Sequence, residues 1–260
     1  LSSATTVSGQ GVGSAYVEQV SLVKKQDDVF EILEDGDKGK ADIYHVHTVN
    51  PSYRIRMDSR HVNVIYVHFI PSTLDGSLRM PKFAFAIFKK YVVATYKKAD
   101  EIVVVNPGFI SPLLELGCDK ERITYIPNYV SSAQFHPLPP EEVAFIRERY
   151  GVGKEAFVVL GCGQVQTRKG VLDYIEVAKR NPDITFVWAG GFSFGVMTDG
   201  YDELRKIMGN PPENVKFIGI VDRGMMNGVF NMSDVLFMPS FSELFPMSIL
   251  EKSSLKLGMK

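Results

Sequence analysis

The chain alternates between short apolar runs and longer segments in which apolar residues recur every three or four positions. The apolar runs are rich in Val, Ile and Phe, which is typical of strands buried on both faces of a parallel sheet. We predict strands at 42–47, 62–68, 102–105, 123–126, 157–161, 185–189, 215–219 and 235–238. We predict helices at 81–99, 109–116, 141–150, 171–180, 201–208 and 223–230. This alternation indicates an α/β fold with parallel sheets and right-handed crossovers.

A segment rich in Pro and Ser, residues 128–140, separates two strand–helix series. We therefore predict two Rossmann-like domains, 1–135 and 150–260. They are expected to face each other across a cleft, because open sheets bind ligands beyond the carboxyl ends of their strands. The first four residues look like the end of a strand, and 252–260 looks like a short basic tail. We expect the second domain to be truncated.

The composition narrows the functional classes. A net charge of −1 argues against a dedicated nucleic-acid binder. The two cysteines, Cys118 and Cys162, have no paired spacing, which argues against a disulfide framework or a zinc cluster and fits a reducing cytoplasm. No apolar run reaches the roughly 20 residues that span a bilayer. We expect a cytoplasmic protein that can still bind the inner face of the cell membrane peripherally.

The first candidate for chemistry is the segment 157–170. An apolar strand runs into a glycine turn, and Arg168, Lys169 and Gly170 then open a helix. The start of a helix offers unpaired backbone N–H groups, and two adjacent cations suit a diphosphate. The simpler interpretation is a tight turn whose Lys and Arg are solvated surface residues.

The second candidate is the segment 234–251, which reads as a strand, a Pro-Ser turn, a loop and a helix. Glu243 lies in the loop and Glu251 in the first turns of the helix, with seven residues between them. Two such carboxylates can flank one polyhydroxylated ligand by accepting hydrogen bonds from its hydroxyl groups. An isolated pair of acids is more often surface charge.

The order of the motifs gives a more specific result. Lys169-Gly170, 189–191, 215–219 and Glu243-x7-Glu251 resemble the donor-binding half of retaining glycosyltransferases of family 4, which have the GT-B fold. The N-terminal segments 42–47, 62–68, 99–105 and 123–128 agree with the same family. The resemblance covers nearly the whole chain and implies transfer of a sugar from a nucleotide diphosphate.

The resemblance also implies roles for individual residues. Lys169 would neutralise the donor diphosphate, Glu243 would contact the transferred sugar, and Glu251 would hold the ribose. His68, at the end of its strand, would lie beside the reacting centre. Val221 would lie near the base, and Gly11 and Gly13 would let the backbone approach the phosphates closely. The loop that would supply backbone groups to the donor consists of Phe245, Pro246, Met247 and Ser248.

One position departs from the family pattern. Gln164 stands where the family commonly has Arg, so part of the phosphate clamp must come from elsewhere, and Arg168 is the candidate. Neither donor-side segment carries an Asp-x-Asp motif, so we expect no metal and no cofactor beyond the sugar nucleotide. The spacing of His45, His47 and His68 is weak for zinc and fits polar residues at a strand end.

The helix 81–99 carries five lysines and no acid. Four of the lysines fall within roughly a 100° arc. The apolar residues expected mainly opposite are Phe85, Ile87, Phe88, Tyr91 and Val92. A basic amphipathic helix predicts docking on anionic lipid, although an ordinary surface helix has the same pattern.

The sequence is similar to enzymes that add a second sugar to glycosyl-diacylglycerol, which forms the anchor of lipoteichoic acid. This similarity implies a UDP-sugar donor, either UDP-glucose or UDP-galactose, and a glycolipid acceptor. The alternative is a truncated, inactive remnant that binds a nucleotide sugar without turnover. A dinucleotide-dependent oxidoreductase is disfavoured, because Gly9-x-Gly11-x-Gly13 lacks the G-x-G-x-x-G spacing.

Overall fold

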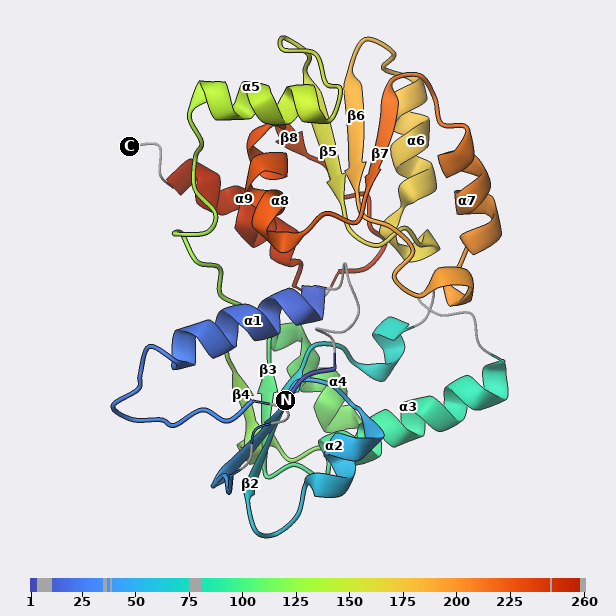
Figure 1. The fold of residues 1–260 in the computed structure, drawn as a ribbon. Helices are drawn as coiled ribbons and strands as arrows, with labels where there is room; N and C mark the ends of the chain where they lie inside the picture. Colours follow the sequence, from blue (N-terminus) through green and yellow to red (C-terminus); the bar gives the residue numbers. More distant parts are fainter. Residues whose placement is uncertain (4–10, 35–36, 38, 75–80, 244, 258–260) are drawn as a thin grey trace. The chain divides into compact units, whose positions relative to one another are not determined.

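The two strand series form two separate parallel sheets in a computed structural model of the chain (Figure 1). The structure describes residues 1–3, 11–34, 37, 39–74, 81–243 and 245–257. These residues form two compact units, each with its own sheet. Of the described residues, unit 1 contains those within 1–3, 12–74 and 81–129, and unit 2 contains Gly11 and the residues from Val130 onward.

The sheet of unit 1 has the order β1-β2-β3-β4, and neighbouring strands are parallel. Its strands are β1 (Ile43–Val46), β2 (Val62–Val67), β3 (Glu101–Val104) and β4 (Ile123–Tyr125). Its helices are α1 (Gly11–Val23), α2 (Pro51–Arg56), α3 (Lys82–Tyr96) and α4 (Ile110–Glu115). Short 3-10 turns lie at η2 (Pro71–Leu74), η3 (Pro107–Phe109) and η4 (Lys120–Arg122). Leu1 runs beside β1, since its carbonyl accepts a hydrogen bond from His47 N at 2.8 Å.

The sheet of unit 2 has the order β7-β6-β5-β8 and is also parallel. Its strands are β5 (Val158–Cys162), β6 (Thr185–Ala189), β7 (Val215–Gly219) and β8 (Val235–Leu236). Its helices are α5 (Pro140–Arg149), α6 (Val171–Lys179), α7 (Tyr201–Gly209), α8 (Arg223–Asn231) and α9 (Met247–Leu257). Two 3-10 turns are η5 (Thr167–Lys169) and η6 (Gly195–Met197). The eight predicted strands are confirmed, with ends that differ by at most two residues.

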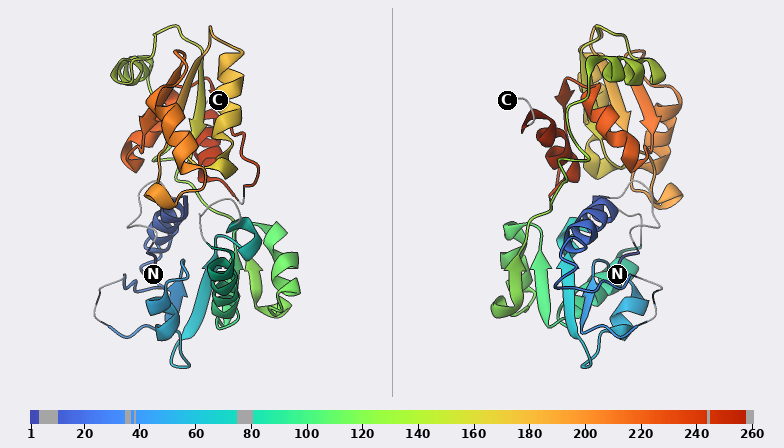
Figure 2. Two further views of the ribbon diagram at one scale, coloured as in Figure 1. Left: turned by 90° about the vertical axis from the view of Figure 1, so that its right-hand side faces the viewer. Right: turned by 60° about the vertical axis from the view of Figure 1, so that its left-hand side comes forward.

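Both faces of the second sheet are covered, as the continuous apolar runs predicted. Side chains alternate along a strand, so Val158 and Leu160 join a core cluster with Phe230, whereas Phe186 and Trp188 join a second cluster with Tyr174. Helices α5, α8 and α9 cover the first face, and α6 and α7 cover the second, as Figures 1 and 2 show. The carboxyl ends of the strands are thereby left for loops.

The linker region differs from the prediction. Residues 130–149 were placed partly in the first domain and partly between domains, but they pack on unit 2. Phe135 is fully buried against Phe230, and the Asn231 side chain donates to the carbonyl of His136 at 3.0 Å. The apolar and amide contacts of this segment therefore attach it to the second sheet's own core.

Two helices were not predicted, and one segment was assigned wrongly. Helices α1 and α2 were missed, although Pro51 at the first helical turn and the Asn50 cap, which accepts from Ser52 N at 3.0 Å, are a start signal for α2. The part of the expected basic tail that the structure describes, 252–257, is helical, because α9 continues to Leu257. The Lys252 ammonium donates to the carbonyls of Phe230 and Ser233, at 2.6 and 2.7 Å, and so ties α9 to the end of α8.

Helix α3 is buried only toward its C-terminal end, at Val92, Thr95 and Tyr96. Ile87 was expected on the apolar side of the helix, mainly opposite the lysines, with either lipid or the core as its neighbour. The structure leaves 65% of its surface exposed, and Phe83 is 73% exposed, so neither side chain is packed into the core. Asp75, which precedes this helix in the sequence, lies outside the described residues.

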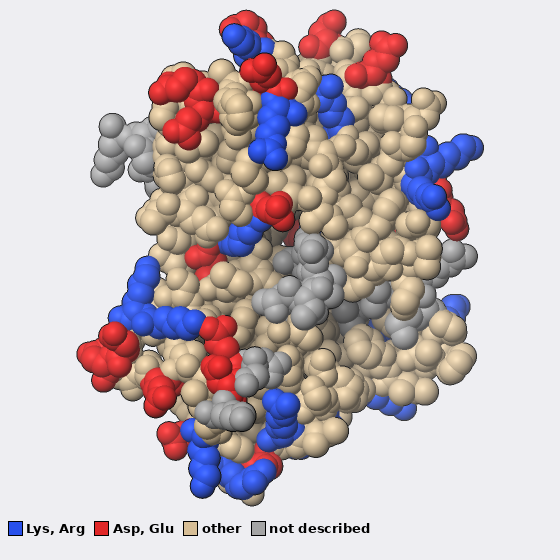
Figure 3. All heavy atoms as spheres, viewed as in Figure 1, with Lys and Arg blue, Asp and Glu red and all other residues tan. Residues whose placement is uncertain are grey.

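Among the described residues, no helix has the length and apolar character needed to cross a membrane. Acidic and basic side chains are interspersed over the face seen in Figure 3, which agrees with the near-zero net charge.

Candidate functional site

Two loops of unit 2 are joined at the carboxyl ends of β5 and β8. Gly170 has φ +66°, and a Cβ at this position would lie 2.2 Å from the carbonyl oxygen of Pro239. The amide of Phe241 donates to the carbonyl of Arg168 at 3.0 Å, and the Arg168 guanidinium donates to the carbonyl of Ser242. A residue without Cβ is required at Gly170 both by its φ and by this close approach. The glycine of the Lys-Gly pair therefore lets the two loops meet.

Lys169 and Glu243 form an ion pair within this loop junction. Both side chains are largely buried, with 13% of the lysine and 22% of the glutamate exposed. The lysine side chain lies over Gly163, because a Cβ on this glycine would be 3.2 Å from Lys169 Cε. The ammonium group is thereby held next to the glycine turn that follows β5.

A second ion pair involves Glu251 on α9 and Arg223, the first residue of α8. Arg223 Nη1 donates to Glu251 Oε1 at 2.6 Å. Only 6% of the glutamate side chain is exposed. The guanidinium also lies over the ring of Phe135, 5.1 Å from its centroid. A buried carboxylate is strongly disfavoured unless it is paired, and Arg223 supplies such a partner for Glu251.

The thiol of Cys162 shows that both ion pairs belong to one place. Burial raises its pKa to about 12, and the charges of Glu251, Lys169 and Glu243 also act on it. Cys162 is the last residue of β5. The structure therefore brings the three predicted charged residues together around the carboxyl end of this strand.

The other predicted residues of unit 2 surround this group less directly. Met247 and Ser248 are buried at the start of α9, and the Ser248 hydroxyl contacts the sulfur of Met238 at 3.5 Å. Phe245, Pro246, Gln164 and Val221 are half-buried, and Val221 packs against the core cluster of Phe230. Gly190, with φ +148°, comes so close to the carbonyl of Gly163 that a Cβ would lie 1.8 Å from its oxygen. The turns after β5 and β6 are thus stacked tightly.

His68 follows the carboxyl end of β2 in unit 1, where it contacts a second histidine. His47 Nδ1 and His68 Nε2 are 3.2 Å apart and share one hydrogen bond. Both rings are buried and lie against Tyr66. Burial lowers the pKa of His47 well below its usual range, that of His68 to about 3 and that of His45 to about 4. The imidazoles are therefore neutral at physiological pH.

Gly11 and Gly13 lie in the first turn of α1. A Cβ at Gly11 would meet no atom within 4 Å, so packing of the described residues does not explain a glycine there.

Within the described ranges, no group of three or more His, Cys, Asp or Glu side chains is placed to hold a metal ion. One Asp-x-Asp triplet does occur outside the donor-side segments, at 35–37. Its first two residues lie outside the described part, and the Asp37 carboxylate accepts from the amide of Glu34 at 2.7 Å.

Sequence reasoning missed three residues of these sites: Arg223, His47 as a partner of His68, and Cys162. Arg223 lies 28 residues before Glu251, and only the packing of α8 on α9 brings them together. A signal did exist for His47: it ends a predicted strand, as His68 does, and the carboxyl ends of parallel strands meet at one edge of a sheet.

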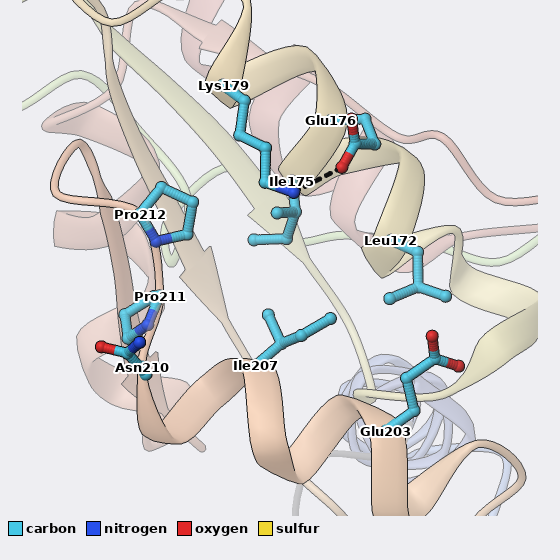
Figure 4. A pocket seen from close by; sticks show the side chains of 9 residues that line it. All are labelled: Leu172, Ile175, Glu176, Lys179, Glu203, Ile207, Asn210, Pro211 and Pro212. Carbon is cyan, nitrogen blue, oxygen red and sulfur yellow. Dashed lines mark hydrogen bonds and ion pairs between the residues drawn. The ribbon is translucent and has the colours of Figure 1, made fainter.

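A separate groove lies between α6 and α7, with a volume of about 580 Å³ (Figure 4). Leu172, Ile175 and Ile207 form its apolar wall, and a Glu176–Lys179 ion pair of 2.6 Å lies at its edge. None of the predicted site residues lines this groove.

Comparisons with known proteins agree with the fold and show the family. Residues 142–257 match the family model described as glycosyl transferases group 1. The chain is 45% identical over 259 residues to alpha-galactosylglucosyldiacylglycerol synthase of Streptococcus pneumoniae, covering 98% of this chain and 69% of that protein. It is 25% identical over 243 residues to the processive diacylglycerol alpha-glucosyltransferase of Acholeplasma laidlawii, covering 93% and 70% of the two chains.

Solved structures show the same fold. The crystal structure of Anabaena HepE in complex with UDP-glucose matches with a TM-score of 0.66 at 19% identity, over 82% of this chain and 57% of that one. WaaG, a glycosyltransferase involved in lipopolysaccharide biosynthesis, matches with a TM-score of 0.65 at 14% identity, over 94% and 75% of the chains.

The two parallel sheets have the GT-B fold of these solved structures, and the sequence relatives make the chain a glycosyltransferase. Within that class, the chain belongs to the glycosyl transferases group 1 family.

Proposed function

We propose that the protein transfers a hexose from a UDP-sugar to the sugar of a glycosyl-diacylglycerol, with retention of the anomeric configuration. The observation that carries this proposal is the convergence of Lys169, Glu243 and Glu251 at the carboxyl end of β5. A cation beside two acceptor carboxylates matches the three parts of a sugar nucleotide: diphosphate, sugar and ribose.

The chemistry follows from where charge develops. As the bond between the sugar and the diphosphate breaks, negative charge grows on the leaving phosphate, so a fixed cation stabilises the transition state more than the ground state. Lys169 supplies that cation, and its ammonium is held in place by Glu243 and by the turn at Gly163. The acceptor hydroxyl attacks the same face of an oxocarbenium-like sugar, and the leaving phosphate oxygen takes its proton.

Arg168 makes a contact that was not predicted, and its role at the phosphates stays a prediction. Its guanidinium donates to the carbonyl of Ser242, so it joins the two loops. Gln164 is half-buried in the turn after β5 and offers an amide donor in place of a charge. We assign the charge at the phosphates to Lys169 and the cohesion of the loops to Arg168.

The acceptor is assigned from the relatives. Both are named for glycosyl transfer in diacylglycerol glycolipid synthesis, one as a synthase of a galactosylglucosyl product and the other as a glucosyltransferase. A glycolipid acceptor stays in its bilayer, so the enzyme must meet a membrane surface.

Helix α3 is the surface that we assign to membrane contact. Phe83 and Ile87 are exposed between Lys82 and Lys90, so apolar and cationic groups share one exposed face. Insertion of the two apolar side chains at the headgroup level, together with attraction of lysines to anionic lipid, is how interfacial helices bind.

We propose further that transfer needs no metal, since the Lys169 ammonium would supply the cation at the diphosphate. Activity that survives an excess of EDTA is the expected result, and loss restored by Mg²⁺ or Mn²⁺ would contradict it.

The decisive experiment supplies UDP-[¹⁴C]glucose or UDP-[¹⁴C]galactose with glucosyl-diacylglycerol in mixed micelles. A labelled diglycosyl lipid with an α-linkage, identified by NMR, is expected from one donor. UDP binding without any transfer would instead indicate a binding protein without activity, and a β-linkage would exclude retention.

A further inference from the structure

We propose that Arg223 is a positioning residue that fixes the Glu251 carboxylate for the two hydroxyl groups of the donor ribose. The inference rests on the proposed function, because it takes Glu251 as the ribose ligand. Arg223 itself is assigned to Glu251, not to the nucleotide.

The geometry places Arg223 where three elements meet. It is the first residue of α8, it pairs with Glu251 in the second turn of α9, and its guanidinium covers the ring of Phe135. Phe135 is fully buried and belongs to the segment that precedes α5. A planar cation held between a ring and a carboxylate has little rotational freedom left.

Burial makes this partner necessary. The Glu251 side chain is only 6% exposed, and a lone carboxylate in such a place takes up a proton or turns toward water. A protonated carboxyl donates one hydrogen bond and loses acceptor capacity, whereas a carboxylate offers about four acceptor sites on two oxygens. The contact with Arg223 Nη1 uses part of this capacity at Oε1 and orients the rest.

The packing of α8 on α9 keeps the pair in register. Lys252, the residue after Glu251, donates to the carbonyls of Phe230 and Ser233 at the end of α8. Arg223 thereby joins the start of α8 to α9, and Lys252 joins the end of α8 to α9. The orientation of Glu251 is set by helix packing as well as by the ion pair.

The test compares binding of UDP with binding of 2′,3′-dideoxy-UDP by isothermal titration calorimetry. The wild-type chain should bind UDP about 10-fold or more tightly than the dideoxy compound, because the hydroxyl groups bond to a charged acceptor. Glu251→Gln should remove most of this preference, and Arg223→Gln should reduce it to a similar extent. The double variant should keep the same small preference for UDP over the dideoxy compound as Glu251→Gln alone. A second loss is not expected, because the two residues act as one unit.

Two controls separate positioning from general damage. Arg205→Gln removes another arginine that lies over an aromatic ring, that of Tyr201 at 5.8 Å, and it should leave the preference unchanged. Lys169→Ala should weaken the binding of UDP and of dideoxy-UDP by the same factor, so the preference for the ribose hydroxyl groups is unchanged. Thermal melting of each variant shows whether it is folded. If Arg223→Gln is unfolded, Arg223→Lys takes its place, because lysine keeps the charge and lacks the planar fork.

The outcomes are distinct. A folded Arg223→Gln or Arg223→Lys protein with the full wild-type preference would overturn the role of Arg223 while leaving the proposed function intact. A wild-type chain that binds UDP and dideoxy-UDP equally would overturn the ribose role of Glu251 and this inference with it. A wild-type chain that does not bind UDP would contradict the proposed function itself.

Discussion

The ammonium group of Lys169 is paired with the carboxylate of Glu243, which lies 74 residues further along the chain. Two βα loops of one sheet supply the partners, one after β5 and one after β8. A cation and an acceptor for hydroxyl groups are therefore neighbours at the carboxyl end of the sheet. This is the side of an open α/β sheet where ligands bind.

The first prediction concerns this lysine. Lys169→Ala should lower the rate of sugar transfer by roughly 10²-fold or more, because the leaving phosphate loses its fixed cation. The measurement is initial rate with saturating glycolipid. Lys179→Ala is the matched control, since Lys179 ends α6, the helix that follows Lys169, and pairs with Glu176 at the edge of the α6–α7 groove. Equal rates in the Lys169 variant and the wild type would remove Lys169 from the mechanism.

The second prediction concerns the junction between the loops. Gly170→Ala places a Cβ against the Pro239 carbonyl in a backbone with φ +66°. The strain and the clash should cost at least about 1–3 kcal/mol of unfolding free energy, measured by urea denaturation, and should weaken UDP binding because the Lys169–Glu243 pair is pulled apart. Gly224→Ala in helix α8 meets no atom within 4 Å and should be neutral or stabilising. A Gly170→Ala protein as stable as Gly224→Ala would show that the loops do not depend on this contact.

The strands were predictable because each is a dense apolar run, and the donor-side loops were predictable because their motifs follow those strands directly. The extent of α9 and the exposure of Ile87 were not, because both depend on which surfaces other elements cover. Arg223 carries no local signal at all: its significance comes from a carboxylate 28 residues away that is buried by helix packing. Sequence patterns therefore located the charged residues that gather at the end of β5 better than the residues that support them.

The third prediction follows from the buried histidines of unit 1. Their pKa values are lowered in the folded chain, to about 4 for His45 and about 3 for His68, mainly because burial disfavours the charged form. Above the ordinary histidine pKa near 6.5, these imidazoles are neutral in both the folded and the unfolded chain, so they do not lower the unfolding free energy. As the pH falls below that value the unfolded chain binds protons that the folded chain does not. Stability then declines toward the folded pKa values, by up to about 1.4 kcal/mol per pH unit for each histidine.

Urea denaturation at pH 7.5, 6, 5 and 4.5 gives the slope of the unfolding free energy against pH. His47→Gln should flatten it, because one of the three proton acceptors is removed. His136→Gln is the control, as His136 belongs to unit 2 whereas the three histidines belong to unit 1. A slope that is the same in His47→Gln and in the wild type would show that these imidazoles do not govern acid stability.

The last prediction tests the membrane surface on α3. Co-sedimentation with vesicles of phosphatidylcholine and phosphatidylglycerol should increase with the anionic fraction and fall with added salt, because the lysine contribution is electrostatic. Replacing Phe83 and Ile87 together by Ser should weaken binding at every salt concentration, since both side chains are exposed and can insert without loss of core packing. Replacing Lys82 and Lys90 by Gln should instead remove the dependence on anionic lipid. Phe145→Ser on α5, an exposed phenylalanine of unit 2, is the matched control and should bind as the wild type does. Binding that ignores both lipid charge and the two α3 variants would remove this helix from membrane contact.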